Sequence, residues 1–368
     1  MSWTMYQWVW RLESPLFVGK PPAGSLNRTR LYVPARALHG AFAAEAARRK
    51  YDEDKAGNNA NSSDSTAKQK DAKKNLSPDY GKFGRELGIW GRFTYLYPAE
   101  KMDDRLLVWL PRYLNEDKKK DDSDGGRNHE ERAGFYWVPQ FVNGDNDSKK
   151  ISLESLNDRA FRRRLLDVRA GTAISPGSDA ALDGSLREME CINPWWRDFT
   201  DSQTSQAFRS PVYLFGYVFL KNNGFKKKME AMDTLFIGGD TRYGLGKIVR
   251  DSWQEFPDDS CFGDSVDLEG EEPEINSDRV LGHAFPFTGD MPMRGNKELS
   301  GGWEISELWR KQKSSPEAEE GAVEDEDKEE VLWAPGSGLK DDSKHVIKWG
   351  INTHGIWYPV DKGASPND

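Results

Sequence analysis

The chain has 368 residues and a net charge of −9, with 36% hydrophobic and 31% charged residues. Its 14 Trp, 12 Tyr and 17 Phe exclude a wholly disordered chain, and its length allows two domains or one elaborated domain. Cys191 and Cys261 form no CxxC pair, which excludes a cysteine zinc site and indicates a reducing cytoplasm. No apolar run reaches membrane-spanning length, so we expect a soluble, unprocessed protein without a membrane partner.

The negative charge is concentrated in two stretches of the last third of the chain. Residues 251–278 contain eleven acidic residues and no Lys or Arg, and residues 316–330 contain nine acidic residues and one lysine. Together they carry −19, so the rest of the chain, within a total of −9, carries +10. Because the distribution of charge matters more than its total, an RNA partner is not excluded. We expect both acidic stretches to be flexible and solvated.

The first part of the chain predicts a strand, a turn, a short strand and a helix. Aromatic and β-branched residues at 5–12 indicate the first strand, and a short second strand is expected at 30–33. Pro34 suits the first turn of a helix, and an alanine-rich segment with a basic end predicts that helix over 36–50. Residues 52–78 are poor in apolar side chains and predict a disordered insertion.

The middle of the chain alternates apolar and charged segments. Its apolar stretches predict three strands, at residues 92–97, 105–110 and 211–220. A second insertion, with nearly balanced charges, is expected at 115–132, and a helix at 226–235. A short basic helix is expected at 153–166, where Arg162, Arg163 and Arg164 mark either a solvated helix end or an RNA contact.

A glycine-rich segment at 236–247 is the most informative part of the sequence. Its glycines and neighbouring functional side chains are Gly238, Gly239, Arg242, Tyr243, Gly244, Gly246 and Lys247. Glycine permits positive φ and close approach, so the loop N–H groups can contact phosphates while the two cations neutralise them and the tyrosine stacks. The segment lacks a P-loop ending and leads into a strand, which disfavours nucleotide cofactors; none is expected. A tight helix-to-strand connection is the alternative.

Two short motifs precede this loop near the start of the chain. Residues 12–19 read Leu-Glu-Ser-Pro-Leu-Phe-Val-Gly, and residues 32–42 read Tyr-Val-Pro-Ala-Arg-Ala-Leu-His-Gly-Ala-Phe. With the loop, they resemble RAMP-superfamily CRISPR-associated proteins, in which a strand of the form L-x-(S/T)-P-L-x-x-G precedes (I/V)-P-(G/A)-S-S-L-(K/R)-G-A. Residues 167–173 and 95–98 resemble segments of larger type III subunits. The resemblance covers roughly residues 5–250.

The resemblance implies an α+β, ferredoxin-like fold of the RNA-recognition-motif type, either as two units or as one with large insertions. Residues 1–250 would bind RNA, and residues 251–368 would complete a second unit or wrap a neighbouring subunit. The implied partners are CRISPR RNA, other RAMP subunits and a polymerase-like large subunit, with target RNA as a further candidate. The glycine loop would be joined in RNA binding by basic residues near the first helix, namely Lys20, Arg28, Arg30, Arg36 and His39.

Catalysis is the main alternative that the resemblance leaves open. Some family members cut RNA with an aspartate in the loop before the first helix, but residues 20–30 contain no Asp or Glu. We therefore expect a non-catalytic subunit at one end of a type III effector complex acting in antiviral defence. The runner-up is a metal-independent endoribonuclease that processes precursor CRISPR RNA with His39, which replaces the family's lysine, as acid or base. A protein–protein scaffold is a third hypothesis.

Several residues have a purely structural alternative. Arg36 is equally consistent with a solvated helix face. His283 and His354 show no ligand spacing, so we expect structural histidines and no metal site. Tryptophans chiefly bury area, so we expect a core or interface position rather than base stacking for Trp8, Trp10, Trp90, Trp109, Trp195 and Trp196.

Overall fold

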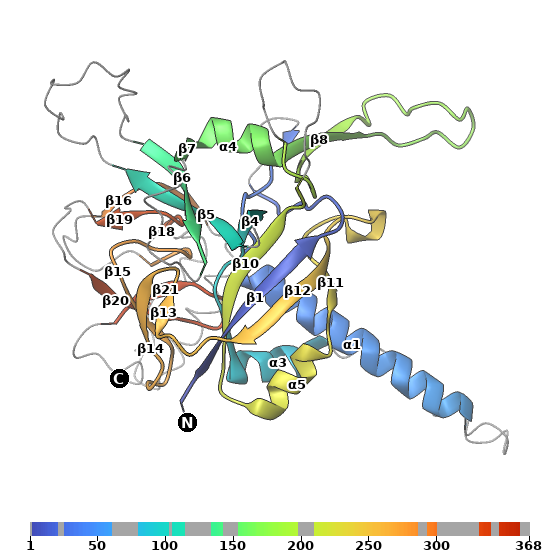
Figure 1. Cartoon of the computed structure of the whole chain (residues 1–368). Coiled ribbons are helices and arrows are strands. Elements are labelled where there is room, and N and C mark those ends of the chain that lie inside the picture. The colour runs from blue at the N-terminus through green and yellow to red at the C-terminus, as the bar shows by residue number, and fades with distance from the viewer. Residues whose placement is uncertain are drawn as a thin grey trace, which may run out of the picture.

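The computed structural model describes residues 2–20, 26–60, 80–102, 105–114, 134–142, 154–197, 210–285, 293–299, 331–339 and 346–360. These residues form an α+β fold with mostly antiparallel sheets, which confirms the predicted class. The strands of the largest sheet are β1 (Thr4–Leu12), β3 (Gly91–Phe93), β4 (Tyr97–Met102), β5 (Arg105–Leu114), β6 (Gly134–Phe141), β7 (Leu156–Asn157), β10 (Tyr213–Leu220), β11 (Thr234–Phe236) and β12 (Lys247–Glu255). Their spatial order is β11-β12-β1-β10-β4-β5-β6-β7, with β3 also paired to β10 (Figure 1).

The centre of this sheet has a regular alternation of strands and helices. Four strands lie in the order β12-β1-β10-β3, and each is antiparallel to its neighbour. Along the chain, α1 (Ala35–Ala60) and α3 (Tyr80–Trp90) lie between β1 and β3, and α5 (Asn223–Glu230) lies between β10 and β12. The glycine-rich loop therefore joins a peripheral strand, β11, to β12, which lies beside the first strand of the chain.

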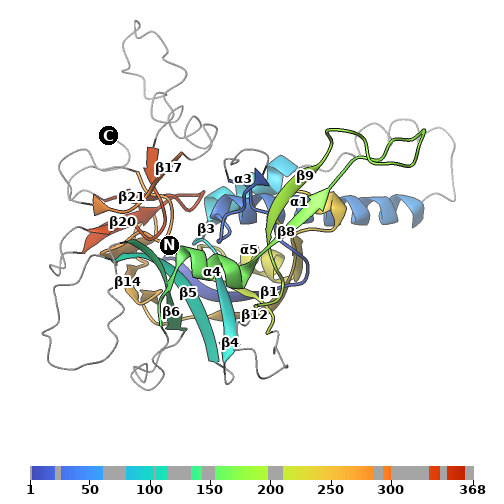
Figure 2. The ribbon, with the colours of Figure 1, turned by 90° about the horizontal axis from the view of Figure 1, so that it is seen from above.

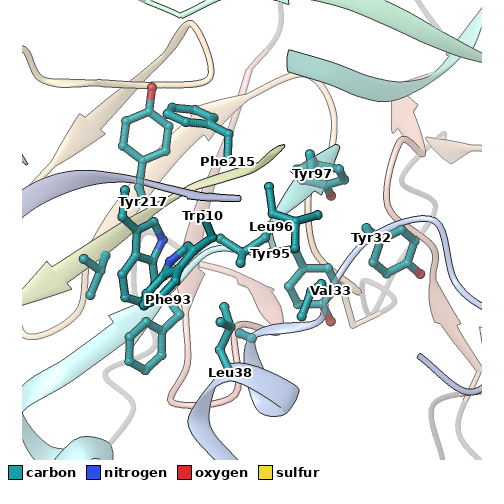
Figure 3. Close-up of a cluster of buried hydrophobic side chains, with 14 of the residues drawn as sticks. Trp10, Tyr32, Val33, Leu38, Phe93, Tyr95, Leu96, Tyr97, Phe215 and Tyr217 are labelled. Atoms are coloured by element: carbon teal, nitrogen blue, oxygen red, sulfur yellow. The ribbon is translucent and has the colours of Figure 1, made fainter. Parts of the chain in front are cut away.

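Aromatic side chains hold the three helices against one face of the sheet. Trp8 of β1 is fully buried, and its ring is nearly parallel to those of Phe42 and Phe93, with centroids 5.6 and 5.4 Å away. Phe83 of α3 stacks on Phe225 of α5 at 5.3 Å. Figure 3 shows Trp10 and Phe93 on this face near Leu38 of α1, whereas Phe215 and Tyr217 of β10 point to the other side of the sheet.

The expectation of core tryptophans is largely confirmed. Trp8, Trp10, Trp109 and Trp196 are buried, and the half-buried Trp90 packs against the core. Trp195 is the exception, because 45% of its surface is exposed.

The opposite face of the sheet is covered by the last third of the chain. Its five-stranded sheet has the order β13 (Ser260–Cys261), β14 (Asp264–Asp267), β15 (Glu274–Ser277), β20 (Ile347–Ile351) and β21 (Trp357–Pro359). Phe262, between β13 and β14, contacts the rings of Tyr97, Phe215 and Tyr217 at centroid distances of 5.7, 5.8 and 5.0 Å. Burial of these rings ties the extension to the central sheet.

This packing corrects the expectation for the first acidic stretch. Residues 251–278 are ordered, because β12 to β15 run through them and their apolar residues reach the core. Several of the acids also pair with cations; Glu272, for example, forms a bidentate ion pair with Arg92 at 2.5 Å. The second acidic stretch, 316–330, lies outside the described residues.

Helix boundaries differ from the predicted ones in three places. Helix α1 continues through residue 60, so the first part of the insertion predicted at 52–78 is helical, and residues 61–79 lie outside the described part. Helix α4 (Asp158–Leu165) begins late because Asn157 caps it, its side chain accepting from the N–H of Ala160. Helix α5 begins early because Asn222 caps it in the same way.

One predicted strand is not formed, and another is divided into two strands. Residues 30–33 contribute only a bridge between Val33 and Leu96, because α1 begins directly afterwards. The strand predicted at 92–97 is divided between β3 and β4, since residues 94–96 leave the ladder for that bridge. The charged insertion at 115–132 lies outside the described residues. In the described part, no helix has the length and apolar character needed to cross a bilayer.

A long hairpin projects from the sheet beside the glycine-rich loop. It is formed by β8 (Leu166–Gly171) and β9 (Arg187–Ile192), and β2 (Leu26–Asn27) pairs with β9 in parallel. Figure 2 shows this arm reaching away from the body of the molecule. The remaining short strands are β16 (Met293–Arg294), β17 (Lys297–Leu299), β18 (Val331–Trp333) and β19 (Gly338–Leu339); β16 pairs with β19 and β17 with β18.

Candidate nucleic-acid interface

The base of the glycine-rich loop is fixed to the segment that follows β1. The N–H of Gly239 donates to the carbonyl of Phe17 at 2.9 Å, and the N–H of Gly246 donates to that of Pro15 at 2.8 Å. Gly238 has φ +84°, and a Cβ there would lie 2.2 Å from the Phe17 oxygen. Gly246 has φ +75°, and a Cβ there would lie 1.9 Å from the Ile237 oxygen. These glycines are required for close backbone packing.

The loop amides are therefore used mainly within the chain. Besides Gly239 and Gly246, the N–H groups of Tyr243 and Gly244 donate to Asp240 and Thr241 carbonyls across the short 3₁₀ turn at Thr241–Tyr243. The N–H of Lys247 donates to the Ser14 hydroxyl at 2.9 Å. These five amides are therefore not available for the phosphate cradle expected from the glycines.

The tip of the loop presents an aromatic ring and a cation to solvent. Tyr243 is 72% exposed, and the neighbouring Arg242 is also exposed. Gly244, with φ +83° and open space around it, reverses the chain after them. Lys247 is half-buried at the start of β12. Exposed rings beside cations are the side-chain set that binds single-stranded nucleic acid.

The β8–β9 arm adds a second cation to this tip. The guanidinium carbon of Arg187, a half-exposed residue at the start of β9, lies 5.6 Å from the centroid of the Tyr243 ring. Its Nη2 lies 3.9 Å from the Asp240 carboxylate. Below them, Met189 and Cys191 of the arm pack against Leu245 of the loop. The arm and the loop thus form one surface, which we call the tip surface: Arg187, Arg242 and Tyr243.

Two of the other predicted cations are held by a carboxylate from the last third of the chain. Lys20 Nζ lies 2.7 Å from Glu298 Oε1, and Arg30 Nη1 lies 2.5 Å from Glu298 Oε2. His283 Nε2 and the Tyr32 hydroxyl lie 3.3 and 3.5 Å from Oε2. We call these five residues the Glu298 cluster. Arg30 is only 11% exposed there, so its charge is paired with Glu298 inside the protein and is largely shielded from solvent.

The electrostatics of the cluster are those of a strong, partly buried ion pair. Burial disfavours the charged form of Glu298, but the hydrogen bond from His283 and the charges of Arg30 and Lys20 outweigh it and hold its pKa well below the ordinary value. Burial, followed by the charge of Glu298, raises the pKa of Tyr32. One neutral tautomer of His283 satisfies both its neighbours: Nδ1 accepts from the Tyr95 hydroxyl at 2.8 Å, and Nε2–H donates to Glu298.

A short backbone ladder connects the Glu298 cluster with the glycine loop. The Lys20 N–H donates to the Arg28 carbonyl, and the Arg30 N–H donates to the Val18 carbonyl. Phe17, one residue before Val18, accepts from Gly239 of the loop. Arg28 is partly exposed, with its Nε 3.8 Å from Glu190 of β9. The structure thus brings Lys20, Arg28 and Arg30 onto the strip of chain that supports the loop.

Arg36 and His39 lie in a different environment, at the start of α1. A turn from the end of the chain covers this helix start, and a Cβ on Gly355 would lie 2.4 Å from the Cβ of Ala35. The His39 ring lies 6.0 Å from that of His354, at an angle of 64°. Arg36 is half-buried. Both histidines pack between elements, as expected for structural residues; the catalytic role of His39 stays a prediction.

The arginine run of α4 is mostly structural. Arg162 pairs with Asp158 at 2.7 Å, one helical turn earlier. Arg164 pairs with Glu100 at 3.1 Å and lies over the Trp196 ring, 4.9 Å from its centroid. Arg187 and Glu298 could not be predicted as site residues from the sequence, because their partners lie far away along the chain. Within the sequence, Arg187 is marked only as the basic first residue of the strand β9.

Comparison with known proteins gives distant likenesses only. No family model and no curated protein matches the chain. Among solved structures, a chain of the type III-B Cmr-beta complex bound to cognate target RNA is 12% identical over 68% of this chain and 96% of that chain, with a TM-score of 0.33. A chain of the same complex with target RNA and AMPPnP is 10% identical over 90% of this chain and 85% of its own length, with a TM-score of 0.38.

A third likeness has the same character. A chain of the Cmr-beta complex in its apo state is 10% identical and has a TM-score of 0.35 over 68% of this chain and 97% of that chain. At such scores these likenesses carry no argument, so the functional conclusion depends on the motifs and the geometry of the chain itself.

Proposed function

We propose that this chain is a non-catalytic guide-RNA-binding and assembly subunit of a type III CRISPR effector complex, located at one end of that complex and acting in antiviral defence. The central strand order β12-β1-β10-β3, with helices inserted after β1 and β10, is that of a ferredoxin-like unit, which we propose as the RNA-binding core. Its partners would be CRISPR RNA, other RAMP subunits and a polymerase-like large subunit.

One observation carries the proposal: the base of the glycine loop is hydrogen-bonded to the protein, whereas the side chains at its tip are exposed to solvent. The base is fixed by hydrogen bonds to Pro15 and Phe17, while Tyr243 and Arg242 stand in solvent beside Arg187. The ring lies beside two exposed cations on a loop with a fixed base, and this combination favours a binding role. Stacking of a base on Tyr243 with phosphate neutralisation by the two arginines fits single-stranded RNA.

The test removes the two exposed cations of the tip surface. Arg242→Ala combined with Arg187→Ala should weaken retention of guide RNA by about tenfold at moderate salt, since each cation neutralises a phosphate. Lys227→Ala with Lys228→Ala is the matched control, because it removes two exposed cations from α5 instead. Equal retention by the two double variants, measured by anisotropy with labelled guide RNA, would overturn the proposed RNA surface. Thermal unfolding of both variants checks that the fold is kept.

A separate experiment tests the absence of catalysis that we propose. Purified protein is incubated in EDTA with a repeat-containing precursor RNA, and the products are separated on a gel. We expect intact RNA with the wild-type chain and with His39→Ala alike. Cleavage that His39→Ala abolishes would make the chain a processing endoribonuclease.

A further inference from the structure

In the Glu298 cluster, several donors converge on one carboxylate. Two cations, Lys20 and Arg30, contact the two oxygens of Glu298 at 2.7 and 2.5 Å, and His283 donates a third bond. With His283 neutral, two positive charges face one negative charge, so the cluster retains an excess of +1. A phosphodiester carries one negative charge and offers oxygen acceptors to the same donors.

The cations of this site belong to the strip of chain that supports the glycine loop. Lys20 and Arg30 lie in the ladder that begins at Phe17, the residue to which Gly239 is bonded. The acid that neutralises them comes from β17, 278 residues after Lys20. Lys20 remains 30% exposed, so an anion arriving along the loop can reach its ammonium group.

The strand that carries Glu298 is held by few backbone contacts. β17 has three residues, and among the described strands it pairs only with β18, at Lys297 with Trp333 through Leu299 with Val331. The side chain of Lys297 lies over the Trp333 ring, 4.8 Å from its centroid, so it stabilises the pairing of β17 with β18 rather than the attachment of β17 to the segment at 20–32. β18 is anchored, because Trp333 exchanges two backbone hydrogen bonds with Ala284. For β17 itself, the ionic contacts of Glu298 are the link to the segment at 20–32.

We propose that Glu298 occupies the place of an RNA phosphate in the free chain and is displaced by that phosphate when RNA binds. The inference rests on the proposed function, because it assumes that RNA runs along the glycine loop towards Lys20 and Arg30. The exchange conserves charge: one carboxylate leaves and one phosphodiester enters, and both cations stay paired. Weak, indiscriminate anion binding at Lys20 and Arg30 is suppressed until an RNA also engages the tip surface.

The test compares two variants that lose the same charge at different places. Glu298→Gln uncovers the two cations, whereas Glu86→Gln removes a carboxylate that pairs with Lys228 on the surface, 2.8 Å away. The probe is a labelled guide-length single-stranded RNA, titrated at one fixed salt concentration. We expect Glu298→Gln to bind about fivefold or more tightly than wild type, the range of an ordinary coupling between sites, and Glu86→Gln to bind within about twofold of wild type.

The outcomes separate the inference from the function on which it rests. If wild type binds RNA and Glu298→Gln binds no more tightly than Glu86→Gln, Glu298 stays paired with Lys20 and Arg30 when RNA binds. The displacement would then be wrong, and the proposed function would stand. If none of the three proteins binds RNA, the proposed function falls and the inference falls with it.

A measurement on the wild-type chain covers the case in which Glu298→Gln does not fold. Hydrogen exchange of residues 297–299 should become faster when guide RNA is added, because release of Glu298 removes the ionic contacts of β17. Unchanged or slower exchange there, at saturating RNA, would overturn the displacement. The amides of β1, which are buried in the central sheet, provide the internal reference.

Discussion

Two basic regions of this molecule differ in how much of their charge is available. At the tip surface, Arg242 and Arg187 stand in solvent beside an exposed tyrosine. In the Glu298 cluster, Lys20 and Arg30 are paired with a carboxylate, and Arg30 is almost buried. The sequence alone gives both regions the same RNA-binding prediction. We expect a cation to contribute to recognition only if the tertiary structure leaves it in solvent, as at Arg242, or allows its partner to leave.

The physical reason lies in the cost of burying a charge. Arg30 is retained in a low-dielectric position only because Tyr32 and Glu298 surround it, and their influence raises its pKa although burial alone would lower it. Arg242 and Arg187 avoid this cost by remaining hydrated. The two regions can be separated experimentally, and the following tests run from the largest expected effect to the smallest.

The largest effect is expected at the base of the glycine loop. Gly246→Ala places a Cβ 1.9 Å from the Ile237 oxygen at positive φ, so the unfolding free energy should fall by on the order of 3 kcal/mol or more. Gly244→Ala also has positive φ but meets open space, so it should cost only about 1 kcal/mol. Urea unfolding measures both. Similar losses for the two variants would mean that the base of the loop is not fixed as described.

An intermediate effect is expected when the Glu298 cluster is broken. Glu298→Gln leaves Arg30 largely buried without its counter-charge, which should lower the unfolding free energy at pH 7 by roughly 2 kcal/mol. Because the folded-state pKa of Glu298 is depressed, the stabilisation is present above the unfolded-state value of about 4.3 and is lost as the pH falls below it.

The pH dependence of the difference in unfolding free energy between wild type and Glu298→Gln tests whether the ion pair is its cause. Urea unfolding of wild type and Glu298→Gln between pH 3 and pH 7 should give curves that diverge at neutral pH and approach each other in acid. A constant difference across this range would contradict the ion pair, since the contribution of Glu298 to stability would then not depend on the ionisation of its carboxylate. Glu86→Gln should shift little, because its partner Lys228 is exposed.

The smallest effect is expected from the exposed ring of the tip surface. Tyr243→Ala should weaken binding of single-stranded RNA by about 1 kcal/mol, or roughly fivefold, because one base loses its stacking partner. Tyr243→Phe keeps the ring and should bind like wild type. Neither change should alter thermal stability, as the side chain is 72% exposed. Equal affinity for all three proteins would remove Tyr243 from the interface and leave the arginines to carry the contact.

Local sequence patterns predicted the elements whose own residues decide their conformation. The aromatic and β-branched run gave β1, Pro34 and the alanines gave the start of α1, and the all-apolar run at 211–220 gave β10. The glycine loop was predicted because positive φ can be inferred from the residue type itself. Residues 251–278 were predicted wrongly, because counting charges missed the alternating apolar residues, such as Val266 and Ile275, that bury the strands between them.

The sequence by itself determined the α+β class, the central strands and the presence of a glycine-rich, cationic loop. Only the tertiary structure decided which cations face solvent, because the partner of Arg30 lies 268 residues away, and Arg187 meets Tyr243 through an arm that no short pattern connects to the loop. Backbone propensity acts over a few residues, whereas Coulombic pairing and burial act through space. The residues that an RNA would meet are therefore fixed by how the last third of the chain folds back over the first.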